Sequence, residues 1–75
     1  MPLSETHVLV RLAERIKTLR AAKDWSQEVL AERASMQRSY VADLERGSRN
    51  PSVRTLVKIA NAFKVTLKEL FEDGG

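Results

Sequence analysis

The segment from Ser26 to Pro51 places the strictest limit on how this chain can fold. Helical spacing gives each half of the segment a buried face, formed by Val29, Leu30 and Ala34 in the first half and by Val41 and Leu44 in the second. The break around Met36 is too short for two helices to pack side by side in antiparallel. The second helix therefore leaves at a steep angle, and one of its faces points away from the domain.

The outward face of this second helix is polar. Its residues are Gln37, Arg38, Ser39, Ala42, Asp43 and Arg46. The first three stand at the N-terminal end, which is the end that reads base edges when the second helix of a helix-turn-helix enters the DNA major groove. Arg38 is the strongest candidate, because one guanidinium can bind O6 and N7 of guanine together. The alternative is that Arg38 is an ordinary solvated arginine.

Several short runs at fixed spacing carry a resemblance to a known family. They are Ser26-Gln27, Leu30-Ala31, Tyr40-Val41, Leu44-Glu45-Arg46-Gly47, Ser48-Arg49-Asn50-Pro51-Ser52 and the terminal Leu-x-x-Leu-Phe segment. Together they resemble the phage-repressor-like, or XRE/Cro-like, helix-turn-helix family over roughly Leu12 to Phe71. The resemblance implies an all-α fold, a compact five-helix bundle of the lambda-repressor-like DNA-binding type with the helix-turn-helix at helices 2 and 3. The run Arg38-Ser39-Tyr40-Val41 with Arg49-Asn50-Pro51 looks most like the small controller proteins of restriction–modification systems.

The chain departs from this family at its turns. Asp24 and Ser35 stand where glycine is usual, and a serine in the left-handed conformation costs roughly 1 kcal/mol. Gln37 stands at the N-cap of the reading helix, where Ser, Thr or Asp caps better. The side chain of Gln37 is therefore available to read a base instead.

Composition sets the class of protein. The 75 residues, 43% of them hydrophobic, predict a single domain over residues 1–75 with an ordered core at about 7–72. With no cysteine, no signal segment and no membrane-length apolar run, we expect a cytoplasmic protein. One His and no glycine-rich phosphate loop argue against an enzyme, a metal site or a cofactor. The formal charge of +3 is compatible with a polyanionic partner.

The remaining helices are scaffold. The first is expected from about His7 to Lys23, capped by Ser4, with an apolar stripe of Leu9, Leu12, Ile16 and Leu19. Ser26 caps the second helix and Ser52 the fourth, and the apolar face of the fourth is Val53, Leu56, Ile59, Ala60 and Phe63. Thr66 and Glu69 fit a capping box for a short last helix. Trp25 is expected to be a core residue that packs against Val29 or the third helix; the alternative is that it stacks on a nucleotide.

Glu45 needs a cation, because an acid near the C-terminal end of a helix is unfavourable. The resemblance supplies Arg20 as its partner in a structural salt bridge between two helices. Direct phosphate contact by Arg20 is the alternative.

Two sets of residues are assigned to DNA. Gln37, Arg38, Ser39 and Asp43 are the base-reading candidates; a carboxylate at Asp43 repels phosphate but accepts from the cytosine amino group. The phosphate-binding candidates are Gln27, Tyr40, Arg46, Ser48, Arg49 and Asn50. Gln27, Arg49 and Asn50 are among them chiefly because the resemblance implies a phosphate contact there. The alternatives are that Gln27 is merely solvated, that Tyr40 is half buried beside the core, and that the loop with Arg49 and Asn50 is an ordinary exposed loop.

Specificity in this motif requires a second copy, because one helix reads only a few base pairs. The dimer candidates are Val65, Leu67, Leu70 and Phe71, since so short a last helix can hardly bury all of them within one subunit. Their alternative is an ordinary place in the core.

The sequence thus predicts a transcriptional regulator that binds a double-stranded DNA operator of inverted-repeat form as a homodimer, or as a pair of dimers on adjacent sites. The resemblance implies control of its own promoter and of a neighbouring gene. The chain has no room for a sensor domain, so we expect no small-molecule effector. We also expect no membrane partner. The alternatives are an antitoxin or a phage Cro/repressor-like regulator of the same fold, and a protein-binding helical interaction module.

Overall fold

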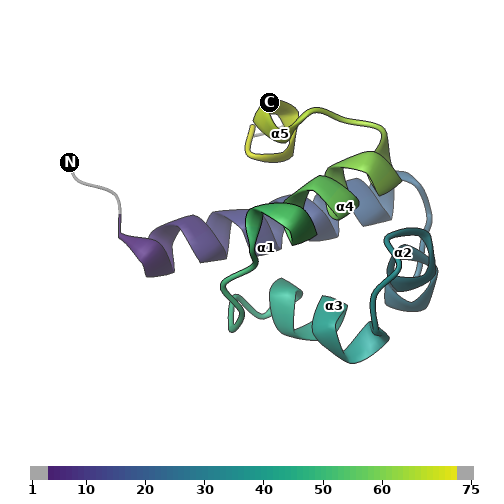
Figure 1. Cartoon of the computed structure of the whole chain (residues 1–75), viewed down its shortest axis with the longest axis horizontal. Helices are drawn as coiled ribbons and strands as arrows, with labels where there is room; N and C mark the ends of the chain where they lie inside the picture. Colours follow the sequence, from purple (N-terminus) through teal and green to yellow (C-terminus); the bar gives the residue numbers. More distant parts are fainter. Residues whose placement is uncertain (1–3, 73–75) are drawn as a thin grey trace.

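The computed structural model describes residues 4–72, and within them the chain forms five α-helices and no strand. These are α1 (Glu5–Ala22), α2 (Gln27–Arg33), α3 (Arg38–Glu45), α4 (Val53–Phe63) and α5 (Leu67–Leu70) (Figure 1). The predicted all-α fold with a helix-turn-helix at the second and third helices is confirmed. Of the residues outside the expected ordered core of about 7–72, residues 1–3 and 73–75 lie outside the described part of the chain.

Four of the helices begin at a hydroxyl N-cap that the sequence indicated. Ser4, Ser26 and Ser52 each accept a hydrogen bond from the backbone N–H three residues on, and Thr66 forms the expected capping box with Glu69. Because Ser4 caps it, α1 starts at Glu5, earlier than the predicted His7. The exception is α3, whose N-cap Gln37 makes no side-chain cap hydrogen bond.

The turns use the left-handed conformation where the sequence suggested it. Asp24 has φ 60°, Ser35 has φ 55° and Gly47 has φ 72°. Lys64, which ends α4 with φ 58°, was not anticipated. A Cβ on Gly47 would lie 3.8 Å from the nearest atom, the Leu9 carbonyl oxygen, so the positive φ and not crowding favours glycine there.

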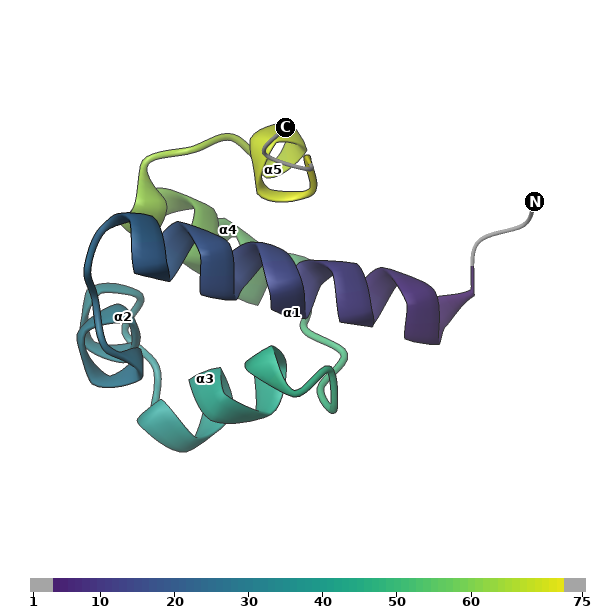
Figure 2. The same cartoon turned by 180° about the vertical axis from the view of Figure 1, so that it is seen from behind.

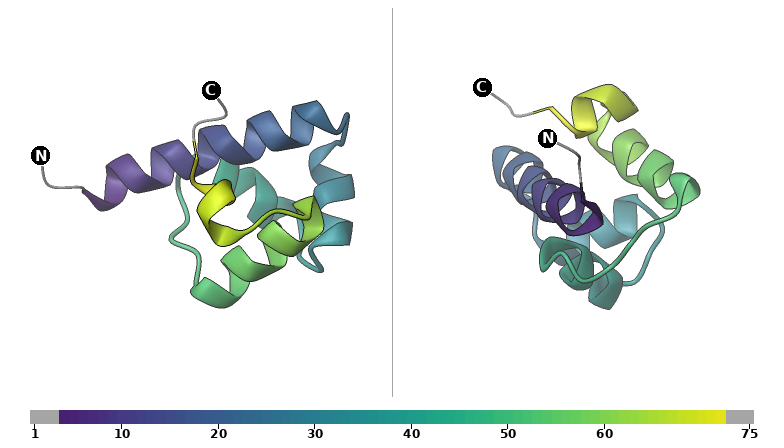
Figure 3. Two further views of the ribbon diagram at one scale, coloured as in Figure 1. Left: turned by 90° about the horizontal axis from the view of Figure 1, so that it is seen from above. Right: turned by 90° about the vertical axis from the view of Figure 1, so that its left-hand side faces the viewer.

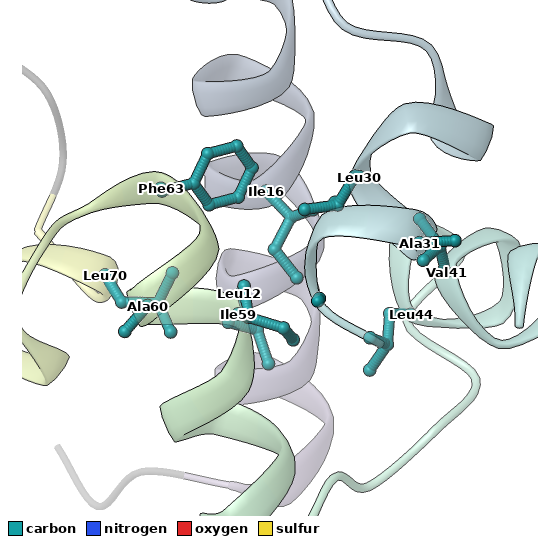
Figure 4. Packing of buried hydrophobic residues seen from close by; sticks show 11 residues of the cluster. Leu12, Ile16, Leu30, Ala31, Val41, Leu44, Ile59, Ala60, Phe63 and Leu70 are labelled. Atoms are coloured by element: carbon teal, nitrogen blue, oxygen red, sulfur yellow. The ribbon is translucent and has the colours of Figure 1, made fainter. Parts of the chain in front are cut away.

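The hydrophobic core gathers around the middle of α1 (Figure 4). Its large fully buried members are Ile16, Leu30, Val41, Leu44, Ile59, Phe63 and Leu70, with Leu12 and Ala31 almost as buried. Two predicted core positions are wrong. Val29 and Val53 are exposed, because the buried face of α2 runs through Leu30 and Ala31 and because Val53 is the first residue of α4.

Trp25 is partly buried and packs against the core. Its ring stacks on Phe63 of α4, with the centroids 5.4 Å apart, a partner that the sequence did not indicate. The guanidinium of Arg33 lies 4.8 Å from the ring centroid and the ammonium of Lys23 5.6 Å from it. Trp25 thus joins the α1–α2 turn to α4.

The helices are arranged so that α3 and α5 lie far apart. In Figures 1 and 2, α1 and α4 cross the middle of the molecule, with α3 on one side of them and α5 on the other. The side view in Figure 3 agrees. Figure 1 looks nearly along the axis of α2, while α3 lies across the view, so α3 leaves α2 at the expected steep angle. No helix in the described part of the chain could span a bilayer.

Candidate nucleic-acid interface

The N-terminal end of α3 projects from the domain. Val41 and Leu44 bury the inner face of α3, whereas Gln37, Arg38 and Ser39 are exposed. Gln37 does not use its side chain as a cap, so the amide of this exposed residue is not committed to the backbone of α3. The structure therefore brings three of the four base-reading candidates together on one outward surface.

A buried ion pair fixes the position of α3. Arg20 of α1 donates to Glu45 of α3 through Nε at 2.7 Å and Nη2 at 2.9 Å, and its Nη1 donates to the Trp25 carbonyl at 2.8 Å. The two side chains are 22% and 4% exposed. This is the contact that the resemblance implied, and it ties the two helices and the α1–α2 turn together.

The Glu45 carboxyl stays ionised in this setting. Burial by itself raises the pKa of Glu45, but the hydrogen bonds from Arg20 and Gln27 and the charge of Arg20 outweigh it, and the pKa lies below its usual value. The pKa of Arg20 is raised, chiefly by its hydrogen bond to Glu45. Each charge thus stabilises the other.

Gln27 connects this buried pair to the surface. Its Nε2 donates to Glu45 Oε1 at 3.0 Å, and its Oε1 accepts from Arg38 Nη1 at 3.4 Å. The first residues of α2 and α3 are therefore linked through one amide. This link was missed from the sequence, because the two residues come together only after α2 and α3 have packed.

A second cluster, which we call the Asp43 cluster, joins the end of α3 to the following loop. It consists of Tyr40, Asp43, Arg46, Ser48 and Arg49. Arg46 forms an ion pair with one carboxylate oxygen of Asp43, and Arg49 Nε lies 3.4 Å from the other. The Arg49 guanidinium also lies 4.9 Å from the centroid of the half-buried Tyr40 ring.

The backbone of the Asp43 cluster is held as well. Ser48 donates to the carbonyl oxygen of Asp43 from its backbone N–H at 3.1 Å and from its hydroxyl at 3.0 Å. Arg46, Ser48, Arg49 and Asn50 are all exposed or half-exposed. The structure thus gathers most of the phosphate-binding candidates beside α3, but the carboxylate of Asp43 points to arginines of its own chain.

Comparison with known proteins agrees with this geometry. The helix-turn-helix family, HTH_3, matches residues 16–70, which run from the middle of α1 to the end of α5. The chain belongs to the helix-turn-helix family. Control protein C.MunI from Mycoplasma sp is 39% identical to it over 67 residues, which make up 88% of this chain and 90% of that protein.

Two solved structures show the likeness of this helix-turn-helix protein in three dimensions. The restriction-modification controller protein C.AhdI from Aeromonas hydrophila superposes with a TM-score of 0.81 at 44% identity, over 84% of this chain and 96% of that one. The controller protein C.Esp1396I, solved as a tetramer in complex with its natural 35 base-pair operator, superposes with a TM-score of 0.74 at 29% identity over 87% and 96% of the two chains.

The last helix of this helix-turn-helix protein leaves part of its apolar surface uncovered. Leu67 is 38% and Phe71 39% exposed, and Val65 is half-buried. Leu70 is completely buried within its own chain. The prediction that Leu70 contacts a second copy is therefore wrong, because its side chain fills the core of its own subunit.

Arg15 of α1 anchors this last helix. Its Nε and Nη2 donate to the carbonyl oxygen of Glu69 at 3.2 and 3.0 Å. An open hollow beside α5 is lined by His7, Val8, Arg11 and Phe71. Among the described residues, no group of three or more His, Cys, Asp or Glu could hold a metal ion.

Proposed function

We propose that this protein is a sequence-specific transcriptional regulator that binds an inverted-repeat DNA operator as a homodimer. The observation that carries the proposal is the exposed start of α3, where Gln37, Arg38 and Ser39 stand together beside a loop rich in arginine. A helix presented in this way fits the major groove with its N-terminal residues on base edges. The controller proteins to which the chain is similar, one of them solved on its operator, support the same interpretation.

The proposed contacts divide into two groups. Arg38, with Gln37 and Ser39, reads bases; Tyr40, Arg46, Ser48, Arg49 and Asn50 position the phosphates. Gln27 is assigned differently from the sequence-based prediction. Protein groups bond both ends of its amide, so we propose that it orients Arg38 instead of binding a phosphate.

The dimer contact is proposed on the far side from α3, at the exposed Leu67 and Phe71 with Val65 beside them. This placement leaves both reading helices free, as two helices entering successive grooves roughly 34 Å apart require. By likeness to the controller proteins, we propose that the regulated genes are its own and a neighbouring one of a restriction–modification system.

Selection of bound sequences from a random duplex pool tests the DNA proposal. The expected result is an inverted-repeat consensus with half-sites about one helical turn apart. Arg38→Ala should then relax preference at one position of each half-site, by about 1–3 kcal/mol. Arg49→Ala is the matched comparison and should weaken all sequences evenly. A pool from which no sequence is enriched contradicts the proposal.

Sedimentation tests the dimer. Replacing Leu67 and Phe71 together by Ser should shift the protein to monomer at micromolar concentration. Val53→Ser removes an exposed apolar side chain from α4 and is the matched control, which should leave the dimer intact. Wild-type protein that stays monomeric at high micromolar concentration, with and without DNA, contradicts this part.

A further inference from the structure

Asp43 puts a negative charge into the surface that is proposed to meet DNA phosphates. Its carboxylate lies between the guanidinium groups of Arg46 and Arg49. The three side chains together carry a charge of +1, because the single carboxylate offsets one of the two arginines. A carboxylate in that position binds the same N–H groups that phosphate oxygens would bind.

We propose that the Asp43 carboxylate is an internal competitor for DNA phosphates at Arg46 and Arg49. DNA of any sequence must displace the carboxylate or share the arginines with it. Asp43 therefore weakens binding to all duplex DNA and raises the protein concentration at which the operator is half occupied. This inference rests on the proposed function and describes the regulation of the same surface.

The opposite role would be that Asp43 organises the arginines for DNA, but the cluster does not depend on the carboxylate for its shape. Ser48 is held by the backbone carbonyl of Asp43, which any residue at that position supplies. Arg49 is held over the ring of Tyr40. Gly47 turns the chain with its own positive φ. Removing the carboxylate therefore frees the arginines and leaves the loop in place.

The ion pairs are also exposed enough for phosphate to replace them. The side chains of Asp43, Arg46 and Arg49 are 27%, 64% and 52% exposed. Ion pairs in water contribute little to stability, so the arginines can leave Asp43 without unfolding α3. A DNA backbone offers a denser array of negative charge than one carboxylate and gains from the counterions that it releases.

The test is the binding of Asp43→Asn to a fluorescent random-sequence duplex and to the selected operator, measured by anisotropy between 50 and 200 mM salt. Asparagine keeps the size and the backbone carbonyl and removes the charge. Binding of both duplexes should tighten at low salt, and this gain over wild type should shrink by about threefold between 50 and 200 mM salt for each additional phosphate that the freed arginines bind. The slope of log affinity against log salt should steepen by about 0.9 for each such phosphate.

Asp24→Asn is the matched control. It makes the same change in net charge in the exposed α1–α2 turn, and asparagine tolerates the left-handed conformation of that residue. The α1–α2 turn lies at the opposite end of the molecule from the loop after α3 (Figure 1), and salt screens exposed charges that are far apart, so this variant should keep the wild-type slope. Melting curves of both variants establish that each is folded.

A third arm separates competition from simple repulsion. In an Arg46→Ala/Arg49→Ala background, Asp43→Asn should produce no further tightening, because the contested arginines are gone. Equal tightening in that background overturns the inference, as does an Asp43→Asn protein that binds DNA with unchanged or lower affinity. If wild-type protein shows no salt-dependent DNA binding at all, it is the proposed function that fails.

Discussion

Asp43 and Glu45 are two acids of the same helix, both bonded to arginine, in opposite surroundings. They are two residues apart, which is about 200° around an α-helix, so they face nearly opposite ways. Glu45 faces inward, is 4% exposed and receives two hydrogen bonds from Arg20 of α1. Asp43 faces outward, is 27% exposed and meets Arg46 and Arg49, which follow it closely in the chain.

The difference shows that the contribution of an arginine–carboxylate pair to stability depends on its burial and on whether the partner comes from another helix or from a neighbouring position in the chain. The inner pair joins α1 to α3, and losing one member leaves a charge buried without compensation. The outer pairs join residues that are already neighbours and remain in contact with water, so they contribute little to stability. We therefore assign the inner pair to the fold and the outer pairs to the encounter with DNA.

The largest expected effect is that of Arg20→Ala. Removing Arg20 strands the buried Glu45 carboxylate and should lower the free energy of unfolding by about 3 kcal/mol. For a domain of this size that is a fall of roughly 12 °C or more in Tm, measurable by circular dichroism. Binding to all DNA sequences should weaken together, because the whole of α3 is loosened. An unchanged Tm would contradict the structural role assigned to the buried Arg20–Glu45 pair.

Acid should abolish the contribution of the same pair. The pKa of Glu45 in the folded protein lies below its ordinary value of 4.5, so its stabilisation is fully present above about pH 4.5 and is lost as the pH falls through the folded-state pKa. The difference in stability between wild type and Glu45→Gln should therefore be constant at neutral pH and shrink in acid. Denaturant unfolding at several pH values measures it, and a difference that grows in acid contradicts the assignment.

Gln27→Ala tests the hydrogen-bonded link between the buried Glu45 and the exposed Arg38. Gln27 donates to the charged Glu45 and accepts from Arg38, so its loss should cost about 1–2 kcal/mol of stability. Discrimination at the base that Arg38 is proposed to read should also fall, while the salt dependence of DNA binding stays the same. A salt slope shallower by about 0.9 would instead restore Gln27 to the phosphate contacts.

The smallest effect on stability is expected from changing the outward-facing acid, Asp43. Asp43→Asn removes two exposed ion pairs and should change the free energy of unfolding by less than about 0.5 kcal/mol. Glu45→Gln, measured beside it in urea, serves as the matched buried substitution. Equal losses from the two variants would mean that the inner and outer acids do not differ in the way proposed.

Sequence reasoning was most successful where the determinants are local. The N-caps Ser4, Ser26, Ser52 and Thr66 depend on a few consecutive residues. The left-handed Asp24 and Ser35 were indicated by the resemblance, in which glycine is usual at both positions. It was less successful at helix edges. Val29 and Val53 were expected to be buried and are exposed, whereas Leu70 was expected at an interface and is fully buried in its own chain, because coverage depends on how closely a neighbouring helix approaches.

In the candidate site, too, the local features could be predicted from the sequence and the contacts between helices could not. The outward place of Gln37, Arg38 and Ser39 follows from helical periodicity and was predictable. The partner of Glu45 came from the resemblance alone. The pairing of Asp43 with Arg46 is visible in sequence as a spacing of three at the end of one helix, yet the sequence-based interpretation gave the two residues separate roles.

By itself, the sequence determined the five helices, their caps, the steep turn at Met36 and the polar face that α3 presents. Only the tertiary structure decided which polar groups meet. Gln27 reaches Arg38, and Arg20 reaches Glu45, across gaps that close when α1, α2 and α3 pack. The physical reason is that backbone and capping preferences act over a few residues, whereas side-chain hydrogen bonds between helices depend on distances that the packed core sets.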